Sequence, residues 1–141
     1  MSEAPSLAEL WPDDRASQGL GMAIAALGPG SATVTMTVGP EMLNGHGICH
    51  GGFIFALADS AMAFASNRAG SEAGERALAQ HCAIAYLRPA QRGDRLSAAA
   101  RERGRAGRTA LYDVTVVTET GTVIAEFRGQ TRTLPAARPA P

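Results

Sequence analysis

Apolar and polar residues alternate along residues 31–38. Val34, Met36 and Val38 are separated by threonines, and this period of two is typical of a strand with one buried face. The "GPGS" at residues 28–31, where this predicted strand begins, is typical of a turn. We therefore predict that residues 20–27 and 31–38 form an antiparallel hairpin.

A different pattern follows in "HGGFIFALADSAMAFASN", residues 50–67. This run is too long for a strand, so we predict one long helix from Gly51 to about Arg68. The helix would be apolar on every side, and such a helix must be covered on every side. The one charged side chain before Arg68 is Asp59, which is costly there unless it is paired or functional.

Four more strands are predicted after this helix, over residues 78–87, 94–104, 108–119 and 121–132. The "SAAARE" within the second of them would by itself also fit a helix. Before the hairpin, residues 6–18 are predicted to form a short helical segment, with Ser6 as a cap and Pro12 as an interruption.

The predicted order is two strands, one apolar helix and four strands. One sheet can enclose such a helix only if it curls around the helix or if a second copy helps. This favours an α+β fold with a buried central helix, and a dimer. We expect an N-terminal helical arm over residues 1–17, one domain over 18–133 and a disordered tail over 134–141.

Composition narrows the classes of function. The 141 residues carry 13 basic and 13 acidic side chains with no basic block, which argues against a nucleic-acid surface. The first residues lack an apolar run and no segment is apolar enough to span a membrane, so we expect a cytoplasmic protein. Cys49 and Cys82 fit reduced thiols better than a disulfide. No Cys/His spacing predicts a zinc site, and we expect no metal and no cofactor.

His50, Gly51 and Gly52 stand at the start of the predicted helix. Glycines there allow a ligand to approach the backbone N–H groups of the first turn, which have no partner within the helix. These donors, at the positive end of the helix dipole, would suit a developing oxyanion. The alternative is that the glycines only permit a tight turn.

Gly51 and Asp59 are eight residues apart, which is roughly 12 Å along a helix. One carbonyl group cannot contact both of them on the same helix. Two antiparallel copies related by a two-fold axis would bring Gly51 of one chain beside Asp59 of the other. The spacing therefore predicts a site that is shared between subunits and occurs twice per dimer.

The same segment, with "MLNGHGIC" before it and "AYLRPAQRGD" after it, resembles the hotdog-fold acyl-CoA thioesterases, and among them the phenylacetate-degradation group. The resemblance covers about residues 18–133. It implies a curved antiparallel sheet wrapped around one central helix, and a homodimer or homotetramer with active sites at the subunit interface. The implied reaction is hydrolysis of an acyl-CoA to free acid and CoA, with CoA as part of the substrate.

The resemblance also implies roles for four residues. Asp59 matches the catalytic carboxylate, acting as general base or as nucleophile, and Gly51 matches the residue whose N–H polarises the thioester carbonyl. Asn44 matches an asparagine that helps to hold water or the acid, although a turn residue fits its place in "NGH" equally well. His50 is commonly near the site in relatives, although its role could be only to pin the loop.

One position departs from the pattern. Relatives often place a Ser or Thr near the start of the strand after the helix, facing the acid, whereas this chain reads "AQHC" over residues 79–82. Either Gln80 or His81 replaces that hydroxyl, or it is absent. A core or surface histidine is the simpler reading of His81.

Three arginines are candidates for the nucleotide end of CoA, because the guanidinium fork suits phosphate. They are Arg88, Arg105 and Arg108, and the "GRAGR" that contains the last two resembles a basic turn of the family. Each of them, taken singly, also fits an exposed turn.

Other functions are weaker. A Cys49–His50 nucleophile is disfavoured, because adjacent residues rarely aim at one point. A hydratase of the same fold would need a histidine soon after Asp59, and none occurs before His81. A regulatory acyl-CoA-binding module would need an added DNA-binding domain, and the N-terminal arm is too short and too acidic to be one.

The predicted substrate is an aryl- or medium-chain acyl-CoA, including phenylacetyl-CoA or a hydroxylated derivative. The alternative is a non-catalytic acyl-CoA-binding hotdog protein.

Overall fold

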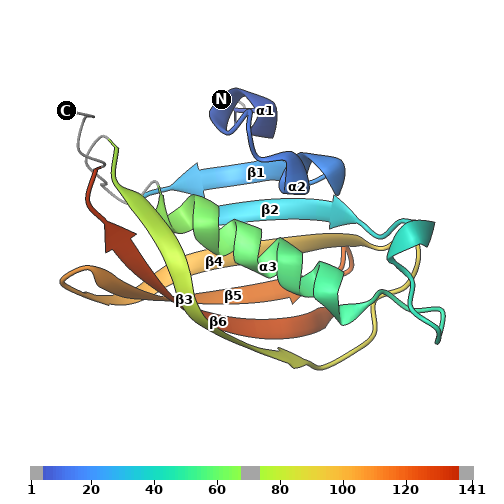
Figure 1. Ribbon diagram of the computed structural model, residues 1–141. Coiled ribbons are helices and arrows are strands. Elements are labelled where there is room, and N and C mark those ends of the chain that lie inside the picture. Colours follow the sequence, from blue (N-terminus) through green and yellow to red (C-terminus); the bar gives the residue numbers. More distant parts are fainter. Residues whose placement is uncertain (1–4, 68–73, 137–141) are drawn as a thin grey trace.

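The computed structural model describes residues 5–67 and 74–136. Within them, six antiparallel strands form one curved sheet, and one long helix lies across its inner face (Figure 1). The helix is α3 (Gly51–Ser66). In spatial order the strands are β1 (Ala23–Gly28), β2 (Ser31–Thr37), β4 (Arg95–Ala106), β5 (Thr109–Val117), β6 (Val123–Leu134) and β3 (Arg76–Tyr86). The predicted hotdog fold, a curved antiparallel sheet around one central helix, is confirmed.

Two short helices, α1 (Leu7–Leu10) and α2 (Arg15–Gly19), precede the sheet. The predicted cap is present: Ser6 Oγ accepts a hydrogen bond from the Glu9 N–H at 3.2 Å, and the Glu9 carboxylate accepts one from the Ser6 N–H at 2.9 Å. Pro12 lies between the two helices, as expected of an interruption.

These two helices pack against the C-terminal half of α3. The Trp11 ring stacks on the Phe64 ring with 4.7 Å between centroids, and Ser17 Oγ lies 3.0 Å from Ser60 Oγ. The N-terminal arm therefore covers part of the side of α3 that the sheet leaves open.

Strand β4 contains the "SAAARE" that suited either a helix or a strand. It lies between β2 and β5, with Ala98 opposite Val34 on one side and Val116 on the other. Leu96, Ala98 and Ala100 are buried, and the residues between them are more exposed. Neighbouring strands on both sides settle the conformation of a segment whose own propensity is weak.

One face of α3 is buried against the sheet, where Leu57, Ala58 and Ala61 have no exposed surface. The sheet approaches closely at Gly129 of β6, where an added Cβ would overlap Met62 Sδ. Small residues on both elements therefore set the distance between α3 and the sheet.

The opposite side of α3 is less covered. Phe53, Ala56, Ser60 and Ala63 recur at intervals of three or four residues, and Asp59 lies beside Ser60. All five are partly exposed, and we call them the open stripe. Within one chain, the expectation that the helix is covered on every side is met on the sheet side and, through the N-terminal arm, only in part on the opposite side.

Both ends of α3 are tied to β3. Asn67 caps the C-terminal end of the helix, where its Nδ2 donates to the Ala63 and Ala77 carbonyls at 2.8 and 3.2 Å and its Oδ1 accepts from the Ala77 N–H at 3.0 Å. At the other end of β3, the Tyr86 O–H donates a hydrogen bond to the Gly51 carbonyl at the start of α3, at 2.8 Å.

The predicted helix end at Arg68 and residues 137–141 of the predicted tail lie outside the described residues. The predicted start of that tail at residue 134 is wrong, because Leu134 is the last residue of β6.

Strand β3 forms one edge of the sheet, and no strand of the described ranges pairs with its outer side. It is 11 residues long and carries exposed apolar side chains, with Leu78 51 % exposed and Tyr86 49 % exposed. A long edge of this kind is a ready surface for pairing with another chain.

None of the helices in the described ranges is long and apolar enough to cross a bilayer.

Candidate active site

The first turn of α3 includes a backbone donor, the N–H of Gly51, that has no partner among the described residues. The Gly52 N–H donates to His50 Nδ1 at 2.9 Å, and the Phe53 N–H donates to the His50 carbonyl at 3.0 Å. The Gly51 N–H has no acceptor among the residues that the structure describes. The glycine that the sequence singled out as an oxyanion donor is therefore the one whose N–H is available. His50 is the N-cap of the helix and holds the turn in this arrangement.

Tyr86, a residue that the sequence did not single out, covers this turn. Its O–H donates to the Gly51 carbonyl at 2.8 Å. A Cβ at residue 51 would stand 2.9 Å from Tyr86 Cζ, so the ring fills the space that a side chain would need. Burial, and secondarily Cys49, raise the pKa of Tyr86 above its ordinary value.

A pocket of about 380 Å³ opens beside this turn. It brings together three of the predicted residues, Asn44, Gly51 and Arg88, with mostly apolar walls. Its lining residues are Asn44, Ile48, Cys49, Gly51, Ile54, Tyr86, Leu87, Arg88 and Pro89. A cavity with apolar walls and a few polar groups suits an organic ligand with a small polar centre.

Asn44 has the turn role that the sequence offered for it. Its Oδ1 accepts hydrogen bonds from the His46 N–H at 2.9 Å and the Ile48 N–H at 3.4 Å, which makes it a turn residue. It also lines the pocket beside Gly51. Its Nδ2 group has no acceptor in the described part of the chain, so two donors remain for a ligand or water.

Asp59 lies two turns further along α3, in the open stripe, and does not line this pocket. Burial raises the pKa of its carboxyl group. No hydrogen bond to its oxygens is made within residues 5–67 and 74–136. The carboxylate is therefore a stronger base than an ordinary surface aspartate and has free acceptor sites.

Cys82 of β3 lies close enough to Asp59 to be affected by its charge. Burial and, second, the Asp59 charge raise the pKa of the Cys82 thiol. Cys82 lies opposite Gly129, which faces α3, whereas Gln80 Oε1 accepts a hydrogen bond from Gln130 Nε2 at 3.2 Å. Within this chain a thiol therefore lies near Asp59, where the sequence suggested Gln80 or His81.

The three arginines do not lie together in one chain. Arg88 lines the pocket and donates to the Val123 carbonyl at 2.9 Å. Arg105 and Arg108 flank the β4–β5 turn, at the opposite end of the sheet by strand register. Both have acidic neighbours there, with Arg105 Nη2 2.7 Å from Glu102 Oε1 and Arg108 Nη1 3.8 Å from Glu75 Oε1.

Cys49 does not have the environment of a nucleophile. It is 4 % exposed, burial raises the pKa of its thiol, and its Sγ lies 3.6 Å from the His50 carbonyl oxygen. A nucleophilic cysteine needs a lowered pKa and access. In the part of the chain that the structure describes, no three His, Cys, Asp or Glu side chains are grouped as metal ligands would be.

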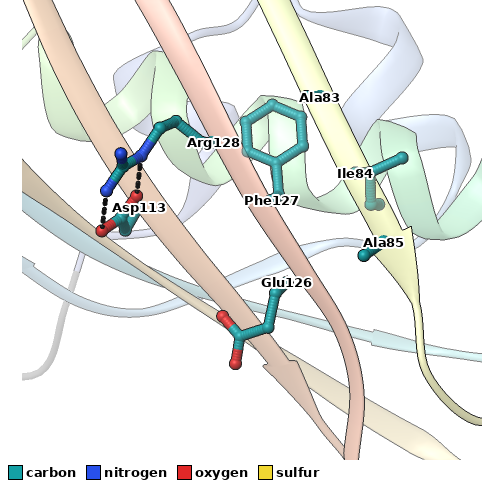
Figure 2. Close-up of a pocket in the computed structure, with 7 residues that line it drawn as sticks. All are labelled: Ala83, Ile84, Ala85, Asp113, Glu126, Phe127 and Arg128. Carbon is teal, nitrogen blue, oxygen red and sulfur yellow. Dashed lines mark hydrogen bonds and ion pairs between the residues drawn. The ribbon is translucent and has the colours of Figure 1, made fainter.

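A second pocket, of about 420 Å³, lies on the outer face of β3, β5 and β6 (Figure 2). Its most polar feature is the ion pair of Arg128 and Asp113, with Nε–Oδ1 at 2.7 Å and Nη2–Oδ2 at 3.0 Å. This contact lowers the pKa of Asp113. Because the guanidinium is committed to a carboxylate, and no predicted site residue lines this pocket, we place the site at the first turn of α3.

Comparison with known proteins identifies the family of this chain. The model of the thioesterase superfamily matches residues 46–125, which include the first turn of α3 and Asp59. The acyl-coenzyme A thioesterase PaaI of Escherichia coli (strain K12) is 41 % identical over 121 residues, or 86 % of this chain and 84 % of that protein. The structure of E. coli PaaI, from the phenylacetic acid degradation operon, covers 94 % of this chain and 93 % of that chain at 38 % identity, with a TM-score of 0.86.

Two further structures are similar. A mutant of the phenylacetic acid degradation protein PaaI from Thermus thermophilus is 42 % identical and has a TM-score of 0.79, over 86 % of this chain and 100 % of that chain. The protein smu.793 from Streptococcus mutans UA159, in a structure bound to acetyl CoA, is 26 % identical with a TM-score of 0.75, over 83 % of this chain and 91 % of that chain.

Proposed function

This chain belongs to the thioesterase superfamily, and we propose that it hydrolyses an aryl- or medium-chain acyl-CoA to free acid and CoA. Phenylacetyl-CoA and its hydroxylated derivatives are the first candidates. Support for CoA esters comes from the E. coli relative, an acyl-coenzyme A thioesterase, and from the Streptococcus mutans protein with acetyl CoA bound. Support for an arylacetyl group comes from the E. coli and Thermus proteins of phenylacetic acid degradation.

The observation that carries the proposal is the unpartnered N–H of Gly51 at the rim of an apolar pocket. A thioester carbonyl oxygen in the pocket would accept this hydrogen bond at the positive end of α3. Attack at the carbonyl carbon places negative charge on that oxygen, and a fixed donor stabilises this charge more than it stabilises the ground state. Gly51 is thus the oxyanion donor.

Asp59 supplies the other half of the reaction. Its raised pKa makes it a better proton acceptor, so it either takes a proton from the attacking water or attacks the carbonyl carbon itself. The tetrahedral intermediate then collapses and expels the CoA thiolate. In the second route a mixed anhydride forms on Asp59, and water hydrolyses it.

Gly51 and Asp59 of one helix are too far apart for one carbonyl, so the proposed site contains Gly51 of one chain and Asp59 of its partner. The unpaired edge of β3 and the open stripe of α3 support this pairing, because both expose apolar side chains that a second copy could cover. An antiparallel dimer would also place the end of the partner that carries Arg105 and Arg108 near Arg88, where the three could share the phosphates of CoA.

The test is release of thiol from phenylacetyl-CoA, a hydroxyphenylacetyl-CoA, benzoyl-CoA, hexanoyl-CoA and acetyl-CoA. We expect turnover with the aryl or medium-chain esters, and a fall of at least about a hundredfold in Asp59→Asn, the scale of general-base removal. The matched control is Asp13→Asn, which makes the same change at an exposed acid of the N-terminal arm and should keep wild-type turnover.

Calorimetric binding of a non-hydrolysable CoA thioether separates the two candidate functions. Equal binding by the wild type and Asp59→Asn, with turnover in the wild type alone, supports hydrolysis. Tight binding by a wild type that releases no thiol from any of these esters would favour the non-catalytic acyl-CoA-binding protein.

A further inference from the structure

We propose that Tyr86 is a positioning residue for the Gly51 donor, and that it is the reason why residue 51 must be a glycine. The proposal rests on the function proposed above, because it assigns a role within the same site. It is carried by two contacts that join the end of β3 to the first turn of α3, across 35 residues of sequence.

The first contact is steric. The Tyr86 ring lies against the Cα of Gly51, so that a Cβ there would meet Cζ at 2.9 Å, the phenolic oxygen at 3.1 Å and Cε1 at 3.2 Å. Real Cβ atoms do not approach an aromatic ring this closely, so a side chain at residue 51 would displace either the ring or the helix turn. The ring thereby fixes one side of the peptide that carries the Gly51 N–H.

The second contact is the hydrogen bond from the Tyr86 O–H to the Gly51 carbonyl at 2.8 Å. A carbonyl oxygen has two lone pairs, so it can accept this bond in addition to the one from within the helix. With Asn67 at the far end, Tyr86 fixes the position of α3 along β3. A shift of α3 along its axis would move Gly51 and Asp59 together, away from their partners in the site.

Tyr86 also lines the pocket and is half exposed, so its loss leaves the buried core intact. A residue that only supported the fold would affect stability and turnover together. A positioning residue affects the rate of the chemical step, with little change in substrate affinity, because the donor it holds acts on the transition state.

The first measurement uses Tyr86→Phe, which removes the hydroxyl and keeps the ring. We expect kcat to fall about fivefold, the effect of one ordinary hydrogen bond, with KM nearly unchanged and only the small fall in Tm that the loss of this bond causes. Wild-type kcat in Tyr86→Phe, or a rise in KM at constant kcat, would overturn the role of the hydroxyl.

The second measurement tests the steric contact by rescue. Gly51→Ala keeps the backbone N–H but must push the Tyr86 ring aside, so Tm and kcat should both fall. Adding Tyr86→Ala opens the space, and the double variant should match Tyr86→Ala alone in both properties. The control for the glycine substitution itself is Gly19→Ala, at a position with no atom within 4 Å of the added Cβ.

Equal effects of Gly51→Ala on Tm with and without Tyr86→Ala would overturn the steric role. This comparison does not require activity. A wild type that releases no thiol would therefore refute the proposed function, while the Tm comparison would still decide whether the Tyr86 ring excludes a side chain from residue 51.

Discussion

At the scale of single residues, Asp59 shows how function opposes stability. Its carboxylate lies among the apolar side chains of α3, and burial raises its pKa. The same burial that makes it a better base disfavours its charged form in the folded chain. Asp59→Asn, which replaces the carboxylate by a neutral group of the same shape, should remove the cost of burying this charge.

The raised pKa leads to a prediction on pH. Only the ionised carboxylate can take a proton or attack a carbonyl, so kcat/KM should fall as the pH drops through the pKa of Asp59. That fall should be centred above the ordinary value for aspartate, about 3.9. The measurement is kcat/KM for one ester between pH 4 and pH 8, at constant ionic strength. An acid limb centred at the ordinary value would contradict the raised pKa.

The stability of the fold should also depend on the protonation of Asp59, but stability should fall as the pH rises, whereas kcat/KM falls as the pH drops. Because the folded pKa is above the unfolded pKa, the folded state holds the proton more tightly. The contribution of protonated Asp59 to the free energy of unfolding is therefore fully present below the unfolded pKa, and it is lost as the pH rises through the folded pKa. At pH 7, Asp59→Asn should have a higher Tm than the wild type, and this difference should vanish at low pH.

The residues of the site were only partly predictable from the sequence. Asp59 stands out because it interrupts an apolar run, and Gly51 because it follows His50 at a helix start. Tyr86 could not be found in this way, because its contact with Gly51 spans 35 residues and depends on where β3 ends. Cys82 was missed because the strand register shifts between Ala79 and His81, and this shift decides which side chains of β3 face the helix.

At the scale of elements, Gly129 is one of the small residues that set the distance between α3 and the sheet. Gly129 lies under Met62, and a methyl group there has no room. We predict that Gly129→Ala lowers the free energy of unfolding by about 1 to 3 kcal/mol, the usual cost of overpacking a core. Denaturant unfolding at a fixed protein concentration measures this.

The matched control is Gly104→Ala on β4, where an added Cβ meets no atom within 4 Å. It should change the unfolding free energy by less than about 0.5 kcal/mol. A similar loss in both variants would mean that the cost arises from the strand backbone, and would contradict the role of the Met62 contact.

The elements themselves were largely predictable, because most of them have a clear period. The strand β2 follows from the alternation of its apolar residues, and the helix from Gly51 follows from the length of its apolar run. In β4, "SAAARE" has no decisive period, since alanine is common in helices and is tolerated in buried strands. Its conformation was settled by its neighbours, through the pairing of Ala98 with Val34 and Val116.

At the scale of the whole molecule, one chain contains the parts of the proposed site but does not bring them together. Gly51 and Arg88 lie at one end of α3, while Arg105 and Arg108 lie at the other end of the sheet, with Asp59 between the two. The proposal of a second, antiparallel copy rests on the spacing of Gly51 and Asp59. The surfaces through which the copies would meet could not be predicted from the sequence, because they depend on which side chains the fold leaves exposed.

The proposed sharing of the site between two chains leads to a prediction that no single variant can test. Gly51→Val should be inactive, because the side chain blocks the helix N-terminus, and Asp59→Asn should be inactive, because it lacks the base. In a mixed dimer, however, the normal Gly51 of one chain meets the normal Asp59 of the other. Each mixed dimer therefore has one intact site of two, so its activity per protein should return to about half of the wild-type value.

The two variants would be coexpressed with different affinity tags, and the doubly tagged species would be purified and assayed for thiol release. Two copies of the same variant with the two tags form the control, and should stay inactive. If both residues instead acted within one chain, every mixed dimer would contain only damaged sites, and its activity would be no higher than that of either parent. The mixed dimer therefore distinguishes a site between subunits from a site within one subunit, whichever role Asp59 has in the chemistry.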